Sequence, residues 1–276
     1  MHPLFIESCL GKLFAIYWPP AHEMPVGKAI IHIPAFAEEM NKSRRMVSLQ
    51  AQAFSEQGYG VLILDLFGTG DSAGGFGEAT WQNWLQSIDT AIDWLKQQGA
   101  YSINLWGLRT GVLLAMDFAN SSTHRIERLI AWQPVLNGDT FITQFLRLRV
   151  AAAIMNPTAP REKTADLKQQ LLEGQAIEVA GYWLNPDLVR PLVALHADRL
   201  KWQTINEVAV FEVVANEDIA ASNTPLLAIL QKQPINASLT KVVGDAFWAC
   251  QDISEIPDLI KVTSAWTKQA IINNER

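Results

Sequence analysis

The stretch that most constrains this chain is residues 103–119, where an apolar run leads into a sharp turn and then into a second, almost wholly apolar run. The first run ends at Trp106, and the turn lies between Gly107 and Gly111. The pattern predicts a buried strand followed by a buried helix. Glycines beside a strand-to-helix turn allow close packing and a strained backbone. We therefore expect a sheet protein in which one buried strand ends in a tight elbow at Arg109.

Strand-like and helix-like segments alternate along most of the chain. The strand-like segments are apolar on both faces, which is typical of a mainly parallel sheet of about eight strands with helices on both sides. We expect a hairpin over 4–18 and strands over Lys28–Ile33, 61–65, 103–106, Ile126–Trp132, 208–215 and 239–243. We expect the helices over 42–57, 81–95, 112–119, 225–231 and 256–272, and a loop over 34–41.

The alternation stops at residues 139–206, where two further helices are expected over 140–155 and 162–172. An insertion at this point in an α/β sheet lies near the carboxyl ends of the strands, where ligands bind. The sequence therefore predicts a core domain made of residues 1–138 and 207–276, and a cap insertion over 139–206.

Composition excludes several classes of protein. The chain has 276 residues, 49% of them hydrophobic and 18% charged, with a net charge of −6 and no basic block, which argues against a nucleic-acid partner. No apolar run is long enough to span a bilayer, and the first residues lack a signal-peptide pattern. Cys9 and Cys250 lie far apart, which argues against a zinc site. We expect a cytoplasmic protein with no metal and no cofactor.

Three features resemble the α/β-hydrolase superfamily. They are the elbow at 107–111, the order of the strands, and the loop at 65–72, which resembles the family's D-x-x-G-x-G-x-S turn. Segments 34–45 and 244–248, with the arginine at the elbow, more narrowly resemble the exosortase A system-associated hydrolases of the second type. Those are cytoplasmic proteins of bacteria that combine exosortase sorting of PEP-CTERM proteins with exopolysaccharide production. The resemblance implies an α/β-hydrolase fold.

The catalytic residues that the resemblance implies are not intact. The superfamily triad runs Ser, Asp or Glu, then His, with the serine in the middle of G-x-S-x-G. Here Arg109 takes the serine position, and Ala246 or Phe247 stands where the histidine would follow the last strand. The acid position keeps Asp218, beside Glu217. The five histidines, at 2, 22, 32, 124 and 196, all precede the last strand, so the triad is expected to be degenerate.

Arg109 favours anion binding over catalysis. A guanidinium stays protonated at neutral pH, so it serves neither as nucleophile nor as general base. At the start of a helix it would lie where anions already bind well. Two interpretations stay open: Arg109 binds a phosphate, carboxylate or anionic sugar, or it forms an internal ion pair. The candidate partners are Glu38, Glu39, Glu217 and Asp218.

Other residues near the elbow carry weaker hypotheses. Thr110 would supply an oxyanion-hole amide in a true hydrolase, but its hydroxyl lacks a recognisable base. Glu38 and Glu39 either do acid–base work, or one is solvated and the other pairs with Arg109, Lys42, Arg44 or Arg45. His196 is either a base from the cap or a surface residue, and His32 is expected in the core. The expected pocket comprises Arg109, Thr110, Phe36, Ala37, Glu38, Glu39, Asn41, Trp132, Glu217 and Phe247.

Three functions remain open. The first is an ester or thioester hydrolase, or a related acyltransferase, with relocated catalytic groups. The second is a non-catalytic protein that binds an anionic small molecule at Arg109. The third is an accessory protein in exopolysaccharide production or protein sorting. Ordinary serine-hydrolase activity is expected to be absent in each of them, because the nucleophile and the base are both missing.

Overall fold

The computed structural model describes residues 1–21, 26–155, 161–200 and 205–274. The described residues form an eight-stranded sheet in the order β1-β2-β4-β3-β5-β6-β9-β10, antiparallel at β1, β2 and β4 and parallel from β4 to β10. Its strands are β1 (His2–Ser8), β2 (Gly11–Trp18), β3 (Lys28–Ile33), β4 (Tyr59–Leu64), β5 (Ser102–Leu108), β6 (Ile126–Trp132), β9 (Ile205–Val214) and β10 (Asn236–Val243). This is the mainly parallel sheet that the alternating pattern predicts.

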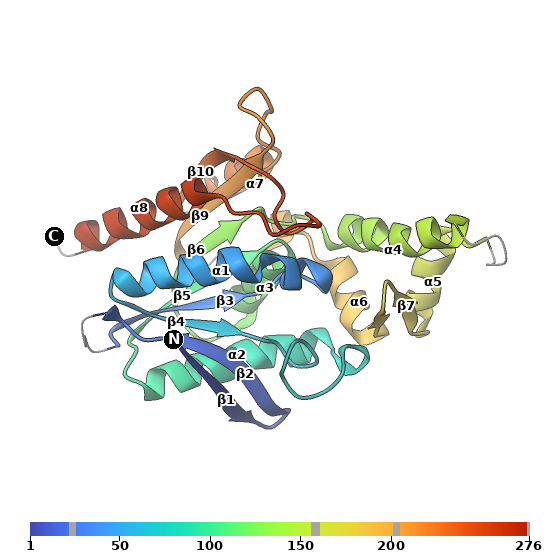
Figure 1. The fold of residues 1–276 in the computed structure, drawn as a ribbon, viewed down its shortest axis with the longest axis horizontal. Coiled ribbons are helices and arrows are strands. Elements are labelled where there is room, and N and C mark those ends of the chain that lie inside the picture. Colours follow the sequence, from blue (N-terminus) through green and yellow to red (C-terminus); the bar gives the residue numbers. More distant parts are fainter. Residues whose placement is uncertain (22–25, 156–160, 201–204, 275–276) are drawn as a thin grey trace.

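Helices cover both faces of the sheet (Figure 1). The helices outside the 139–206 region are α1 (Glu38–Glu56), η2 (Phe76–Glu78), α2 (Trp81–Gln97), α3 (Thr110–Ser121), α7 (Thr224–Leu230) and α8 (Pro257–Asn274). Buried side chains of α1 and α8 share one core with one face of the sheet, while α2 and α3 share the other. The two-sided burial explains why the central strands are apolar along their whole length.

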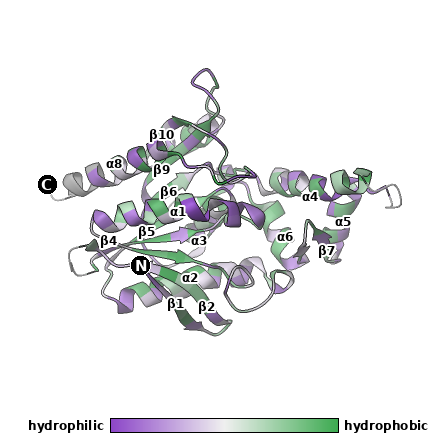
Figure 2. Cartoon of the chain, in the orientation of Figure 1, coloured by the Kyte–Doolittle hydropathy of each residue, from purple (hydrophilic) through white to green (hydrophobic). Residues whose placement is uncertain are grey.

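The hydropathy of individual elements matches their positions. In Figure 2, β4 is mostly green, whereas α1 shows both colours because only one of its faces packs on the sheet. Helix α2 buries the apolar stripe expected from its sequence, and the Thr80 side chain caps it by accepting from the Asn83 amide at 3.1 Å. Gly99 follows this helix with φ of 98°, a conformation that suits glycine at a helix end.

The segment between β6 and β9 folds on itself and projects from the carboxyl ends of the strands (Figure 1). We call its described residues, 138–155 and 161–199, the inserted segment. Its elements are α4 (Gly138–Met155), α5 (Thr164–Glu173), β7 (Ile177–Val179), β8 (Tyr182–Leu184), α6 (Pro186–Ala194) and η3 (Ala197–Arg199). Part of the region predicted as a cap, 156–160 and 201–204, lies outside the described residues.

Two local expectations were wrong. Residues 34–41 do not form one continuous loop, because helix α1 begins at Glu38, immediately after Ala37. Strands β7 and β8 pair as a short antiparallel hairpin in a region where only helices were expected. Among the described residues, no helix is long and apolar enough to cross a membrane.

Candidate binding site at the strand-to-helix elbow

Arg109 sits at a strained turn between β5 and α3. Its backbone has φ 56° and ψ −118°, a region that residues with a Cβ rarely adopt. Close packing leaves no room for a side chain at Gly107 or Gly111, the two glycines of the elbow. A Cβ on Gly107 would lie 2.6 Å from the Val112 backbone, and a Cβ on Gly111 would lie 2.3 Å from the Ile33 carbonyl oxygen. The elbow therefore keeps a shape that presents the side chain at position 109 above the sheet.

The guanidinium of Arg109 has two partners. Its Nε donates to Oε1 of Glu39 at 3.3 Å, and its central carbon lies 5.4 Å from the ring centroid of Trp248. Such a distance allows a cation–π contact. The Arg109 side chain is 20% exposed and the Glu39 side chain is 24% exposed. The pair is therefore half-buried and still reached by solvent.

One edge of Arg109 remains available for a ligand. Among the described residues, no hydrogen bond is made to its two terminal nitrogens, because Glu39 engages only Nε. At the start of α3 the Val112 amide already donates to the Arg109 carbonyl at 3.1 Å, whereas the amides of Thr110 and Gly111 have no acceptor within the helix. A carboxylate or phosphate at this end would meet a guanidinium and the positive end of a helix dipole.

Glu39 is held in a partly dry place. Its Oε2 is buried and has no hydrogen-bond partner in the described part of the chain. Burial raises the pKa of the Glu39 carboxyl, and the charges of Arg109 and Lys42 oppose that rise. Arg109 and Lys42 therefore favour the ionised form of Glu39, against the effect of burial.

A second network joins α1 to the inserted segment. The Tyr182 hydroxyl donates to Oε2 of Glu38 at 3.0 Å, and the Asn41 amide lies 3.2 Å from the same oxygen and 3.3 Å from the Tyr182 hydroxyl. Burial, followed by the nearby charge of Glu38, raises the pKa of Tyr182 to about 12, so this hydroxyl keeps its proton at neutral pH. Glu38 and Glu39 are adjacent in the chain, yet they have separate partners.

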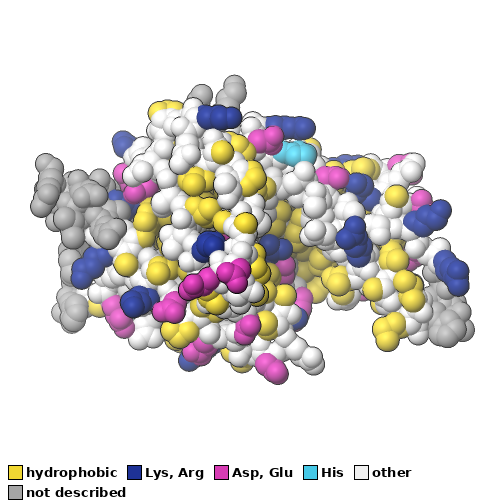
Figure 3. Space-filling view, turned by 90° about the horizontal axis from the view of Figure 1, so that it is seen from above, with side chains coloured by type: hydrophobic (Ala, Val, Ile, Leu, Met, Phe, Trp, Pro, Cys, Tyr) yellow, Lys and Arg dark blue, Asp and Glu magenta, His cyan; other side chains and the backbone are white. Residues whose placement is uncertain are grey.

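Aromatic rings lie beneath this network. Phe36 is buried and packs edge-to-face on Phe76, Phe141 and Phe145 at centroid distances of 5.4, 5.5 and 5.1 Å. Phe141 and Phe145 belong to α4, so the inserted segment shares a core with the body of the protein. From above, a hollow separates the body from the projecting part at the right, with hydrophobic and a few charged side chains inside (Figure 3).

The remaining predicted site residues occupy different environments. Thr110 is buried at the start of α3, and Ala37 is buried with φ 53°, a second strained position beside the elbow. Trp132 is buried and its indole donates to the Thr263 hydroxyl at 3.1 Å. Phe247 is buried against Trp132 with centroids 6.0 Å apart, while Ala246 is exposed. None of these side chains has a hydrogen bond to Arg109 among the described residues.

Glu217 and Asp218 are exposed in the loop after β9. In the described part of the chain, the ion pair of Arg109 is with Glu39, one of the four candidates, and not with these two acids. The buried acid of this region is Glu212 on β9, whose carboxylate accepts from the amides of Ser222 and Asn223 at 2.6 and 3.0 Å. These bonds hold the end of the loop that carries Glu217.

The described residues show no complete triad at the elbow. His196 lies at the base of the inserted segment, with its ring 3.1 Å from the Asn137 amide nitrogen, and His22 is outside the described residues. Ser72 is not free to act, because its hydroxyl donates to the Asp65 carbonyl at 2.6 Å and accepts from the Phe14 amide. No cluster of acids, cysteines and histidines suited to a metal ion occurs within the described ranges.

Sequence reasoning missed two residues of the site. Trp248 was not among the expected pocket residues; it is buried in the core, and its ring also faces the Arg109 guanidinium. Tyr182 belongs to the hairpin that was not predicted, so its contact with Glu38 was not foreseen. The available signal for Trp248 was an aromatic residue close after the last strand, β10.

The sheet order, the elbow and the position of the insertion define an α/β-hydrolase fold. The family profile described as "Serine aminopeptidase, S33" matches residues 29–198, which is more than half of the chain. The chain therefore belongs to this serine aminopeptidase family. No curated protein matches the chain.

Several solved structures share the fold at low identity. Est1E from Butyrivibrio proteoclasticus with ferulic acid bound has 18% identity, a TM-score of 0.69 and 98% coverage of each chain. Mouse alpha/beta hydrolase domain-containing protein 10 has 12% identity, a TM-score of 0.61 and full coverage of both chains (100% each). A thermophilic esterase from Thermogutta terrifontis has 14% identity, a TM-score of 0.60 and coverage of 98% and 99%. At these identities the likeness shows the fold alone.

Proposed function

We propose that this α/β-hydrolase-fold protein binds a small organic anion at Arg109 and does not perform ordinary serine hydrolysis. The observation that carries the proposal is the half-buried guanidinium of Arg109, which is paired through Nε and leaves both terminal nitrogens without a protein partner among the described residues. A carboxylate or phosphate can accept hydrogen bonds from these two nitrogens, and such charge-assisted hydrogen bonds are stronger than neutral ones.

The surroundings of Arg109 favour an anion with an apolar body. Trp248 lies against the guanidinium, and the aromatic rings around Phe36 lie under the inserted segment. The inserted segment acts as a cap, linked to α1 through Tyr182 and Glu38. Est1E binds ferulic acid, an aromatic carboxylic acid, within the same fold, which makes ferulate a suitable probe.

A hydrolase with relocated groups is the second candidate, favoured by the family profile over 29–198. It requires a nucleophile, and Thr110 is buried at the elbow without a base beside it in the described structure. The degenerate triad at Arg109, Asp218 and Ala246 therefore favours binding over turnover. A cytoplasmic role beside exosortase sorting and exopolysaccharide production remains a proposal that rests on segments 34–45 and 244–248.

Isothermal titration with ferulate and with methyl ferulate separates these functions. The binding proposal predicts saturable binding of ferulate, weaker binding of the neutral methyl ester, and no hydrolysis of the ester. Arg109→Gln should weaken ferulate binding at least tenfold, because a hydrogen bond to a charged group contributes roughly 1.5–3 kcal/mol.

The matched control is Arg125→Gln, which removes an arginine whose side chain is 76% exposed. It should leave ferulate affinity unchanged. Equal affinity in the wild type and Arg109→Gln would refute the anion site. Hydrolysis of methyl ferulate that is lost in Thr110→Val would instead support the relocated hydrolase.

A further inference from the structure

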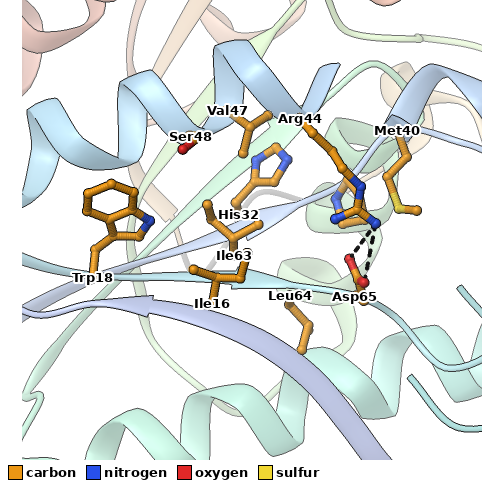
Figure 4. A pocket seen from close by; sticks show the side chains of 11 residues that line it. Ile16, Trp18, His32, Met40, Arg44, Val47, Ser48, Ile63, Leu64 and Asp65 are labelled. Atoms are coloured by element: carbon orange, nitrogen blue, oxygen red, sulfur yellow. Dashed lines mark hydrogen bonds and ion pairs between the residues drawn. The ribbon is translucent and has the colours of Figure 1, made fainter. Parts of the chain in front are cut away.

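A separate cavity of about 190 Å³ lies between α1 and the sheet (Figure 4). Its walls come from β2, β3, β4 and α1, on the face of the sheet opposite α2 and α3. Most of the lining is apolar, with Ile16, Val47 and Ile63 among its side chains. An engineered apolar cavity of about 150 Å³ binds benzene, so this volume suits one six-membered ring with a small substituent.

Two polar atoms at this cavity lack partners. Nδ1 of His32 and Nε1 of Trp18 are both buried, and neither has a hydrogen-bond partner in the described structure. The His32 residue is only 3% exposed. In Figure 4, the Trp18 ring turns its nitrogen toward the Ile63 side of the cavity, and the His32 ring rises from β3 toward α1. Buried polar groups of native proteins are seldom left unpaired, so these two atoms indicate a missing partner.

The charged residues at the cavity favour a neutral occupant. Arg44 lies 3.3 Å from Oδ2 of Asp65, and the Asp65 side chain is 4% exposed while that of Arg44 is 41% exposed. Arg44 is therefore already neutralised, and an anion would meet the Asp65 carboxylate. Burial lowers the pKa of His32 to about 3, with Arg44 adding to this lowering and a main-chain hydrogen bond at Trp106 opposing it. The imidazole is then neutral at pH 7, with one donor and one acceptor nitrogen.

We infer that this cavity is a binding site for a small neutral molecule with one ring and one hydroxyl group, such as a monocyclic phenol. The ligand's hydroxyl oxygen accepts a hydrogen bond from Nε1 of Trp18, and the same hydroxyl donates a hydrogen bond to Nδ1 of His32. The ligand's ring packs against the apolar side chains of the cavity. The site is distinct from Arg109, which takes anions, so the two sites differ in the charge of what they bind.

Titration calorimetry with p-cresol tests this inference, and toluene serves as the same shape without the hydroxyl. We expect saturable binding of p-cresol, with toluene binding about tenfold more weakly, since a net hydrogen bond contributes up to about one power of ten in affinity. Ser48→Met, from α1, should fill the cavity and abolish p-cresol binding. Gln52→Met is the control on the exposed side of α1 and should bind as the wild type does.

His32→Phe keeps a ring of similar size and should remove the preference for p-cresol over toluene. Trp18→Phe tests the other nitrogen if His32→Phe does not fold. Absence of saturable binding to the wild-type protein would overturn the inference, as would p-cresol binding that persists in Ser48→Met. Arg109→Gln should leave p-cresol binding unchanged, so this site and the anion site can fail separately.

Discussion

Glu39 and Arg109 approach within 3.3 Å at the elbow, and the pair is asymmetric. The two side chains are similarly exposed, at 20% for Arg109 and 24% for Glu39, but Oε2 of Glu39 is buried without a partner among the described residues, whereas the Arg109 guanidinium also faces Trp248. Loss of the arginine leaves a carboxylate with a buried oxygen and no hydrogen-bond partner, while loss of the carboxylate leaves a cation that still contacts Trp248. The two halves of the pair should therefore differ in what their removal does.

Removing Arg109 should destabilise the protein more than removing Glu39. We expect Arg109→Gln to lower the free energy of unfolding by about 1–3 kcal/mol, less than the loss for a fully buried pair because solvent reaches this one. Glu39→Gln should lower it by about 1 kcal/mol or less. Urea denaturation of both variants and of the double variant measures the coupling energy. Equal losses for the two single variants would contradict the asymmetry.

The same pair makes a pH prediction. Burial raises the pKa of Glu39, and removal of Arg109 should raise it further. A carboxyl with a raised folded-state pKa loses stabilisation as the pH rises, because the unfolded chain releases the proton first. The free energy of unfolding of Arg109→Gln, relative to the wild type, should therefore fall as the pH rises from about 4.3, the unfolded value. Parallel pH profiles of the two proteins would contradict this prediction.

Much of the fold was predictable from the sequence. Strands Lys28–Ile33 and Ile126–Trp132 have the predicted bounds, since strands buried on both faces read as continuous apolar runs. The start of α1 was misplaced because polar Glu38 and Asn41 lie in its first turn and resemble a loop. The β7–β8 hairpin was missed, since each strand has three residues and too short a pattern to recognise.

The site was predictable only in part. Arg109 and Glu39 stand out as charges beside apolar segments, so their pairing could be listed among four candidates. The contact with Trp248 depends on how the chain turns after β10, which no periodicity encodes. Glu217 is exposed in a loop whose end is held by hydrogen bonds from the amides of Ser222 and Asn223 to Glu212 on β9. Such long-range hydrogen bonds leave no local pattern.

The protein should not react with serine-hydrolase probes. A fluorophosphonate should label no residue, since the elbow carries Arg109 and not a serine, and Ser72 is engaged in hydrogen bonds. Arg109→Ser creates the G-x-S-x-G sequence but should remain unlabelled, because no histidine has a hydrogen bond to the elbow residues in the described structure. A serine esterase labelled in parallel is the positive control. Labelling of the wild-type protein at any residue would contradict the prediction.

Tyr182 should hold the inserted segment against α1. Tyr182→Phe removes the donor to Glu38, so amide exchange in the β7–β8 hairpin should become roughly five- to tenfold faster. Hydrogen-exchange mass spectrometry of peptides covering 177–184 measures this. Tyr101→Phe, at a residue that is 79% exposed, is the matched control. Unchanged exchange in Tyr182→Phe would show that aromatic packing alone holds the segment.

His32 should destabilise the protein in acid. Burial lowers its pKa to about 3, so below the unfolded value of 6.5 the unfolded chain gains a proton that the folded chain does not. Stability is therefore lost as the pH falls. Between pH 6 and 4, the wild type should lose about 1.4 kcal/mol more per pH unit than His32→Phe. Carboxyl groups contribute equally to the pH dependence of both proteins. Identical slopes of unfolding free energy against pH would contradict a buried neutral His32.

We propose that Arg109 receives the negative charge of a ligand. A crystal structure of the protein with ferulate tests this most directly. The carboxylate should lie at the elbow, with its oxygens about 2.7–2.9 Å from the terminal nitrogens of Arg109 while Nε stays with Glu39. Ferulate bound with its carboxylate away from Arg109, or an elbow left empty at saturating ferulate, would contradict the claim.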